Sequence, residues 1–581
     1  MDSRTAAHVL SSIGALLDLS GSPGFKPRAY QNAARAVLAL GADDLAPLLE
    51  SGELLATPGI GPATLSVIRE LIETEESSYL ARLSEATPPG LLQMVRVPGL
   101  GPAKVHFIHQ ELGIESLDEL EDAARDGRLE KLRGFGPKTA RRILDGIPFA
   151  RNAGELTLYH HGLHQAVLLR EAVSRHPDVT EAIIAGSVRR HMEVVGEIDI
   201  VAVCNAHPVE VAHSFANMAS VREVNGEGAT LVIRYVDNVR MRLVCAAADN
   251  AGFMLWRATG SEAHVAQLRD LAARNGITLA EDGIFDPFGG ALALTSEEAL
   301  FETIGLDVIP PELREGSGEI EAAAAHTLPE LLLSSDICGA LHCHSTWSDG
   351  GATIEEMASA AQARGWSYIG ITDHSESAFY ASGMKRDKVL KQHAEIDELN
   401  SRMKGFRILK GIEADILADG SVDYDDETRG TFDFVVGSVH SRFGMTGAAM
   451  TDRILTAMDD PRLTILGHPT GRLLLSRSGY DLDIAAVIEK AAGTGTVLEL
   501  NADPHRLDLD WRHCRAAKEH GVLIEIGPDA HSERGLDTMD IGVGLARKAW
   551  LGRNDVLNAK PVEEVLAVAA KKRGAMKRGA D

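Results

Sequence analysis

The stretch ALHCHSTWSD, residues 340–349, decides the fold of the C-terminal half of the chain. Its apolar start predicts a β-strand, and His342 and His344, two residues apart, then point to the same face of that strand. Two imidazoles on one face are able to hold one cation between them. Asp349 follows in the predicted loop, whereas Cys343 should point to the opposite face and pack there. We therefore expect a metal site where this strand ends.

The same pattern recurs in six further apolar segments downstream. The strands predicted over 368–372, 407–412, 434–439, 463–467, 497–501 and 523–527 lead into Asp373 and His374, Glu413, His440, His468, Asn501, and Asp529 with His531, respectively. Helical patterns such as 354–364 and 485–492 lie between them, which predicts a parallel βα barrel. A single histidine at a strand end is more often a core residue. A repeated pattern favours a metal centre, because the chemistry of such barrels sits at the C-terminal ends of strands.

With these residues the segment from about Ala340 to Lys571 resembles the PHP (polymerase and histidinol phosphatase) domain. The resemblance implies a distorted (βα)7 barrel that holds up to three metal ions. It implies His342, His344, Glu413 and Asp529 as ligands of the first metal, Glu413, His440 and His468 of the second, and Asp349, His374 and His531 of the third. Glu413 would then bridge two of the ions.

This chemistry predicts a metal-dependent phosphoesterase. Mixed imidazole and carboxylate ligands favour Mn, Zn or Fe over Mg. Clustered cations lower the pKa of a shared water and neutralise phosphate oxygens during in-line attack. Asp529 and His531 are candidate proton carriers beside the bridging Glu413. Arg472 is either a positive fork for a phosphate oxygen or a surface arginine.

Three turns of the form Gly-hydrophobic-Gly-Pro recur in the first 150 residues. They contain Gly59 and Gly61, Gly99 and Gly101, and Gly134 and Gly136, followed in the third turn by Lys138. Each precedes an amphipathic helix and presents glycine amides and a helix N-terminus to an anion. They resemble helix-hairpin-helix motifs, which implies sequence-independent contacts with the DNA backbone. The alternative is that they are ordinary turns between helices.

Between these turns and the barrel, Gly186, Ser187 and Arg190 precede a predicted strand that bears Glu197 and Asp199 on one face. This part resembles the nucleotidyltransferase core of family X DNA polymerases, and nearly the whole chain resembles the bacterial family X type with a C-terminal PHP domain. The family holds two Mg ions with three aspartates. Here the apolar alternation of the next strand puts Arg242 in the third position, so we expect an ion pair, a degenerate polymerase site and no dependable Mg site in the palm.

The expected architecture is multidomain α+β and α/β. Residues 1–88 form a helical domain with the first hairpin motif, 89–150 the second and third motifs, 151–316 the palm with a mixed β-sheet and the thumb, 317–335 a linker, and 336–581 the PHP barrel.

Composition limits the class of protein. The chain has 581 residues, 45% hydrophobic content and a formal net charge of −26, so DNA contacts must rely on local basic patches. Five scattered cysteines suit a reducing cytoplasm, and the sequence predicts neither a signal peptide nor a membrane span.

The sequence therefore predicts a DNA-binding, metal-dependent phosphodiesterase, a 3′-5′ exonuclease or 3′-end-processing enzyme of base excision or break repair that acts on gapped, nicked or 3′-end duplex. Three alternatives stay open: a gap-filling polymerase with a PHP editing domain, a small-molecule phosphatase of the histidinol phosphatase type, and a DNA-end binding module without catalysis.

Overall fold

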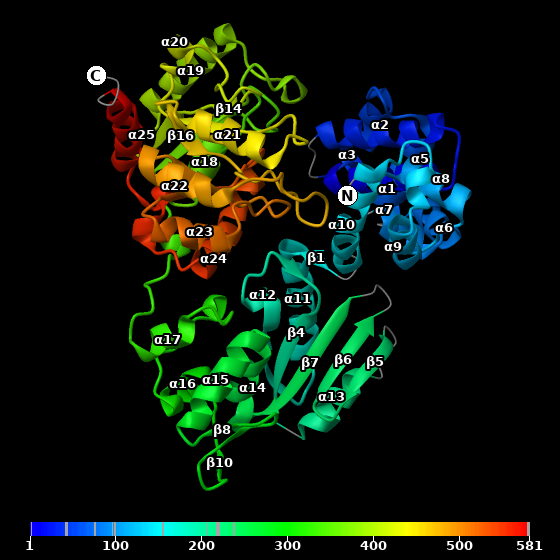
Figure 1. Ribbon diagram of the computed structural model, residues 1–581, viewed down its shortest axis with the longest axis vertical. Coiled ribbons are helices and arrows are strands. Elements are labelled where there is room, and N and C mark those ends of the chain that lie inside the picture. The colour runs from blue at the N-terminus through cyan, green and yellow to red at the C-terminus, as the bar shows by residue number, and fades with distance from the viewer. Residues whose placement is uncertain are drawn as a thin grey trace. The chain divides into compact units, whose positions relative to one another are not determined.

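The computed structural model describes residues 1–577 except 2, 41–43, 75–76, 96, 98–99, 154–155, 206, 217–220 and 236–238. The described chain splits into two compact units (Figure 1). The first comprises Met1–Leu156 with Leu475–Arg477, and the second is the remainder from Thr157 onward. None of the helices in the described segments combines the length and apolarity that a membrane crossing requires.

The first unit is helical. Its elements are α1 Ser3–Leu19, α2 Phe25–Leu40, α3 Ala46–Glu50, α4 Glu53–Ala56, α5 Pro62–Thr74, α6 Ser78–Ala86, α7 Pro89–Val95, α8 Pro102–Leu112, α9 Leu117–Arg125, the 3-10 turn η1 Leu129–Lys131 and α10 Pro137–Ala153. Two apolar clusters form its cores, one within α1–α5 and one centred on α7–α10. Helices α5, α8 and α10 each begin at the proline that ends a Gly-hydrophobic-Gly-Pro turn. Proline is favourable there, because a backbone N–H at the first helical position would have no partner within the helix.

The second unit begins with a mixed five-stranded sheet in the order β2-β4-β7-β6-β5 (Figure 1). Strands β4 and β7 are parallel, and the other pairs are antiparallel. The elements of this part are β1 Thr157–Leu158, α11 Tyr159–Ser174, β2 Val179–Ile184, α12 Gly186–Arg189, β3 Val194–Val195, β4 Ile198–Cys204, α13 Pro208–Ala216, β5 Val221–Glu227, β6 Thr230–Tyr235 and β7 Arg240–Ala247.

A second layer follows the sheet along the chain and has its own core around Phe253, Trp256 and Phe301. Its elements are η2 Ala248–Asn250, α14 Ala251–Thr259, α15 Glu262–Arg274, β8 Thr278–Leu279, β9 Ile284–Phe285, β10 Ala291–Leu292, α16 Glu297–Ile304, η3 Pro311–Leu313 and α17 Glu319–Ala324. Helix α17 lies in the segment predicted as a linker. It packs against this layer, since Glu319 is fully buried and its Oε1 lies 2.7 Å from His264 Nδ1.

From residue 334 on, parallel strands alternate with helices, as predicted. The elements are η4 Ser334–Asp336, β11 Gly339–Ala340, α18 Ile354–Ala363, β12 Tyr368–Ile371, η5 Phe379–Ala381, α19 Arg386–Arg402, β13 Arg407–Lys410, β14 Glu413–Asp415, α20 Asp426–Arg429, β15 Val435–Ser438, α21 Gly447–Met458, β16 Leu463–Leu466, α22 Ile484–Thr494, β17 Val497–Asn501, α23 Trp511–Glu519, β18 Ile524–Gly527, η6 Glu533–Thr538, α24 Met539–Lys548, η7 Arg553–Asp555, η8 Leu557–Ala559 and α25 Val562–Lys577. Helix α18 starts in a capping box in which Thr353 and Glu356 exchange side-chain to backbone hydrogen bonds.

These strands form two parallel sheets, β11-β12-β13 and β14-β15-β16-β17-β18, instead of one continuous ladder. Isolated parallel bridges, Cys343 with Ala530 and His374 with Glu413, link the sheets. The strand predicted over 407–412 is interrupted at Gly411, where a Cβ atom would lie 2.6 Å from the ring of the buried Phe434. This ring fills the interior of the strand layer, and the break explains the distortion expected of the barrel.

Candidate metal centre and palm site

The predicted ligands of the PHP-like segment converge on Glu413, which opens β14 and is only 1% exposed. Its Oε1 lies 3.1 Å from His468 Nε2, 3.3 Å from His440 Nε2 and 3.5 Å from His342 Nε2. Its Oε2 lies 3.0 Å from His374 Nδ1 and 3.7 Å from His344 Nε2. Segments separated by more than 100 residues therefore bring their polar ends to one carboxylate.

Three groups of these residues have ligand atoms within 4.8 Å of one another, a spacing that suits metal ions. They are His342, His344 and Asp529; His374, Glu413 and His440; and His344, Asp349, His374 and His531. The groups overlap with the three ligand sets implied by the resemblance, except that His344 and His374 each belong to two groups. His468 completes the arrangement through its contact with Glu413.

The donor set fits bound cations. His342 Nε2 and His344 Nε2 are buried and have no hydrogen-bond partner among the described residues, although both face carboxylates. A buried imidazole nitrogen without a partner is costly unless it binds a ligand. His342 Nδ1 lies 2.5 Å from Glu499 Oε1, which keeps the proton on Nδ1 and leaves the Nε2 lone pair for a metal. The residues present therefore fit the metals that the family implies.

Charges are strongly coupled in this cluster. Burial raises the pKa of the Glu413 carboxyl, but His440, His374 and His342 outweigh burial and hold that pKa well below its usual range. Burial likewise lowers the pKa of His374, whereas the carboxylates of Glu413 and Asp349 raise it to about 10. For His344, burial together with His531 and His374 outweighs the opposing effect of the Asp529 and Glu413 carboxylates and lowers the pKa to about 3. A cation in the cluster would take the place of the protons on these imidazoles.

Further polar residues lie behind the predicted ligands and form hydrogen bonds with them. Asp415 Oδ1 lies 2.8 Å from His440 Nδ1, and Asn501 Nδ2 donates to Asp529 Oδ2 at 3.1 Å. The carboxylate of Asp373 accepts from the backbone of Ser345 at 2.8 Å and from Gln392 Nε2 at 2.6 Å, so it holds the loop after β11 instead of facing the cluster. Such supports set the tautomer and direction of a ligand. Sequence reasoning missed Glu499 and Asp415, whose position beside strand-end ligands was the available signal.

Two ligand positions have backbone conformations that L-residues rarely adopt. Asp529 has φ of 49° and His468 has φ of 24°. Strain of this kind persists where surrounding contacts impose it, and it is frequent at functional sites. In this conformation the His468 side chain contacts Glu413, and the Asp529 side chain contacts His342 and His344.

Arg472, for which the sequence left a phosphate contact and a surface position open, is held by contacts within the fold. Its guanidinium donates to Arg506 O at 3.0 Å, to Asp510 Oδ2 at 2.9 Å and to Leu507 O, and it lies 3.6 Å from Glu193 Oε1. These acceptors occupy the fork and fix the loop after β17, so the geometry does not support a phosphate contact. Arg506 lies closer to the cluster, with its Nε 3.7 Å from Asp529 Oδ2. Sequence reasoning missed it because the sequence alone does not show that the loop after β17 approaches Asp529.

The palm site contains the expected ion pair. Strands β4 and β7 pair in parallel with Asp199 opposite Arg242, and Arg242 Nε lies 2.5 Å from Asp199 Oδ1 and 3.7 Å from Glu197 Oε1. Arg240 Nη2 contacts Glu197 Oε2 at 3.3 Å. Burial raises the pKa of Asp199 to about 6, and Arg242 opposes this rise. Two guanidinium groups thus occupy the positions at which cations would approach the carboxylates.

The turn beside this pair is also accounted for. Gly186 has φ of 60°, and a Cβ there would lie 1.6 Å from Asp199 Oδ2, so the carboxylate packs directly on the glycine. Ser187 is half-buried next to it. Arg190 donates to Glu315 Oε1 at 2.8 Å and to Thr259 O at 2.6 Å, which ties the turn to the neighbouring layer.

Glycines of the hairpin turns divide into two kinds. Gly59 and Gly134 have φ of 99° and 91°, which explains why they are glycine. Gly61, Gly101 and Gly136 are not in the left-handed region, and apart from chain neighbours no described residue lies within 4 Å of a Cβ added to them. Their lack of a side chain therefore has no reason within the fold and suits the close approach of a ligand to the backbone. Gly99 and the side chain of Lys138 lie outside the described residues.

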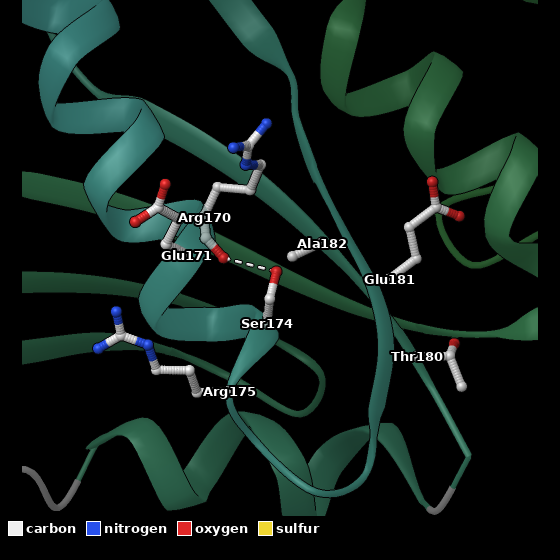
Figure 2. Close-up of a pocket in the computed structure, with 7 residues that line it drawn as sticks. All are labelled: Arg170, Glu171, Ser174, Arg175, Thr180, Glu181 and Ala182. Atoms are coloured by element: carbon white, nitrogen blue, oxygen red, sulfur yellow. Dashed lines mark hydrogen bonds between the residues drawn. The ribbon is translucent and has the colours of Figure 1, made fainter.

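A hollow of about 520 Å³ lies elsewhere, between α11 and β2 (Figure 2). Arg170, Glu171, Arg175 and Glu181 surround it with charges of both signs, and Figure 2 shows that Arg170 and Arg175 point in different directions. It contains no histidine and no converging set of polar groups. The predicted metal ligands around Glu413, referred to below as the metal-ligand cluster, are the candidate centre of the chemistry, and this hollow is not.

Comparison with known proteins identifies three parts of the chain. Family models match residues 91–147 as a SAM-like helix-hairpin-helix tandem, 254–315 as a DNA polymerase beta thumb and 340–500 as a PHP domain.

Among curated proteins, the DNA polymerase/3′-5′ exonuclease PolX of Bacillus subtilis is 36% identical over 98% of this chain and 99% of its own length. Probable phosphatases of Syntrophotalea carbinolica and Acetivibrio thermocellus are 33% and 29% identical over 38% and 31% of this chain, which are 90% and 73% of their own lengths. The domains, their order and the end-to-end match to PolX lead to one conclusion: the chain belongs to the bacterial family X DNA polymerases that carry a C-terminal PHP domain.

Proposed function

We propose that this protein is a metal-dependent 3′-5′ exonuclease or 3′-end-processing enzyme that acts on DNA during repair. The observation that carries the proposal is the convergence of buried, unpartnered histidine nitrogens and carboxylates on Glu413. The name of the Bacillus subtilis relative includes the same exonuclease activity. The helix-hairpin-helix tandem in the same chain supports a DNA substrate, and we propose gapped, nicked or 3′-end duplex as its form.

His342, His344, Glu413 and Asp529 would hold the first cation, His440 and His468 with Glu413 the second, and Asp349, His374 and His531 the third. Mn, Zn or Fe suits these ligands better than Mg. When bound, clustered cations neutralise phosphate oxygens and make a water a good nucleophile near neutral pH.

The protein's own groups would orient the phosphodiester and move protons. Arg506 is the candidate for a non-bridging phosphate oxygen, since its guanidinium lies beside Asp529 and its side chain keeps 21% exposure. His531 is the better placed proton carrier of the two predicted, because its side chain is 35% exposed and that of Asp529 is 10% exposed. His531 Nδ1 is held 2.8 Å from Asp529 O, so Nε2 is its remaining free nitrogen. This nitrogen would hold the third cation when that cation is bound, and it would exchange a proton with the leaving oxygen or with water only when the third position holds no cation.

We further propose that the palm does not polymerise nucleotides. Two-metal nucleotidyl transfer needs both cations. Arg240 and Arg242 already neutralise the charges of Glu197 and Asp199 by forming ion pairs with them. The palm and thumb would serve instead as a scaffold that holds duplex DNA. The name of the Bacillus subtilis relative includes DNA polymerase, so nucleotide incorporation by this protein needs a direct test.

One incubation tests both proposals. The purified protein with Mn²⁺ and a 5′-labelled gapped duplex should shorten the labelled strand and should not extend it when deoxynucleotides are added. His342→Ala should abolish shortening, whereas His520→Ala, a control at an exposed histidine outside the cluster, should leave the rate unchanged. Extension would overturn the assignment of the palm, and shortening that survives in His342→Ala would overturn the assignment of the metal centre.

A small-molecule phosphatase is the second candidate, because the relatives that match the PHP part alone are named probable phosphatases. It predicts rapid turnover of p-nitrophenyl phosphate that excess DNA does not inhibit. The exonuclease proposal predicts faster turnover of DNA ends and competition between the two substrates.

A further inference from the structure

The loop between β12 and α19 has an inverted distribution of large and small side chains. Ala378 and Ala381 are buried, at 0% and 1% exposure, whereas the adjacent Phe379 and Tyr380 are 84% and 69% exposed. Among the large apolar side chains that the structure describes, only Phe288 is more exposed than Phe379. Exposed aromatic surface is unfavourable in water, and such a patch marks a binding site more often than chance.

The loop is fixed and does not expose these rings through lack of structure. Its ends meet where Met384 N donates to His374 O at 2.8 Å. Its middle is held by Ala378 N, which donates to Ser375 O at 3.0 Å, and by Ser377 N, which donates to Asp423 Oδ2 at 2.8 Å. The backbone thus presents the two aromatics in a defined position.

That position is the rim of the metal-ligand cluster. The Tyr380 ring lies edge-to-face against His374, with centroids 6.1 Å apart, and against His440, with centroids 6.0 Å apart. Phe379 is its neighbour on the same 3-10 turn, η5. In a DNA strand the base is one sugar away from its phosphate, so a phosphate at the cluster brings a base to this rim.

We propose that Phe379 and Tyr380 form a stacking platform for an unpaired nucleobase at the 3′ end of the DNA strand being hydrolysed. This inference rests on the proposed exonuclease function and adds the form of its substrate, a frayed or single-stranded 3′ terminus. Every nucleobase has a π-face, so stacking on aromatic side chains holds any base without reading sequence. Base–aromatic stacking strengthens binding by about 5- to 150-fold per base.

Tyr380 has a second role available to it, because its contacts with His374 and His440 would keep those ligands in place. Phe379 separates the two roles, since a side chain with 84% exposure contributes little to packing. A purely structural role predicts weaker Mn²⁺ binding in Tyr380→Ala and no change of any kind in Phe379→Ala.

The first test measures binding and does not need activity. A single-stranded oligonucleotide with 2-aminopurine as its 3′-terminal base is titrated with the full-length protein in the presence of a chelator. Wild-type protein should quench the terminal fluorescence, and Phe379→Ala should lose most of the quenching. The matched control Phe288→Ala, at the other highly exposed phenylalanine, should quench like the wild type. Equal quenching by all three proteins would overturn the platform.

The second test compares hydrolysis of oligonucleotides with a normal and with an abasic 3′ terminus in Mn²⁺. Wild-type kcat/KM should be about 5- to 150-fold higher for the normal end, and this preference should fall toward one in Phe379→Ala. A preference that is absent in the wild type, or unchanged in the variant, would overturn the inference. Wild-type protein that hydrolyses neither end would refute the proposed function instead, and the quenching experiment would still decide whether the platform exists.

Discussion

Replacing Glu499 with glutamine should weaken metal binding although Glu499 is not itself a predicted ligand. Its side chain is fully buried, its Oε1 accepts from His342 Nδ1 at 2.5 Å, and its Oε2 accepts from the backbone N–H of His468. Both oxygens are therefore acceptors. Glutamine has one acceptor oxygen and one amide donor, so Glu499→Gln can satisfy only one of these donors and sets a donor against the other.

The expected loss follows from this mismatch. Disturbing a group that orients a metal ligand costs about 10- to 100-fold in metal affinity or activity. This factor corresponds to about 1.4–2.8 kcal/mol of binding free energy. A buried donor left without a partner should also lower the free energy of unfolding by about 1–3 kcal/mol.

The assay is Mn²⁺ binding by equilibrium dialysis, together with exonuclease rate as a function of Mn²⁺ concentration. Glu499→Gln should be slow at limiting Mn²⁺ and should recover as the metal is raised. Glu525→Gln is the matched control, because Glu525 pairs with Glu499 in the parallel register of β17 and β18. Burial and the charge of Glu499 raise the pKa of Glu525 well above its usual range, so the neutral amide closely replaces a neutral acid. Wild-type Mn²⁺ affinity in Glu499→Gln, or an equal loss in both variants, would refute the reasoning.

Other consequences are open to measurement. Burial lowers the pKa of His264 below its usual 6.5, and His264 in turn helps to hold the pKa of Glu319 below 4.5 despite burial. The folded state therefore binds fewer protons at these two residues than the unfolded state does. The thermal midpoint should fall as the pH drops below about 6.5, and it should fall further below about 4.5. His264→Gln should flatten the upper part of this dependence in thermal melts at pH 5–7, and an unchanged profile would contradict it. Arg242→Met removes the partner of the buried Asp199 and should lower the free energy of unfolding in urea by about 1–3 kcal/mol, with a smaller loss when Asp199→Asn is added; strictly additive losses would argue against the pair. Arg141→Ala, at an exposed arginine of α10, should weaken DNA binding and reduce the salt slope of log K by about 1, and an unchanged slope would remove α10 from the DNA contact surface.

Local patterns in the sequence already determined much of this protein. Alternating apolar runs that end in His, Asp or Glu predicted the strands of the PHP part, because a strand's period of two assigns each side chain to a face and parallel strands end at one edge. The same alternation put Arg242 opposite Asp199, and the β4–β7 register has that pairing. The Gly-hydrophobic-Gly-Pro turns likewise predicted the starts of α5, α8 and α10 through the backbone freedom of glycine and the fixed φ of proline.

Only the tertiary structure decided which distant groups meet. Arg472 and Arg506 are both basic residues after strand ends, but the first is held by Asp510 and two backbone carbonyls while the second lies beside Asp529. The support of His342 by Glu499 and the place of Tyr380 at the rim also join residues far apart in the chain. Periodicity assigns a residue to a face but not to a partner, because the partner depends on how separate strands and loops pack together in three dimensions.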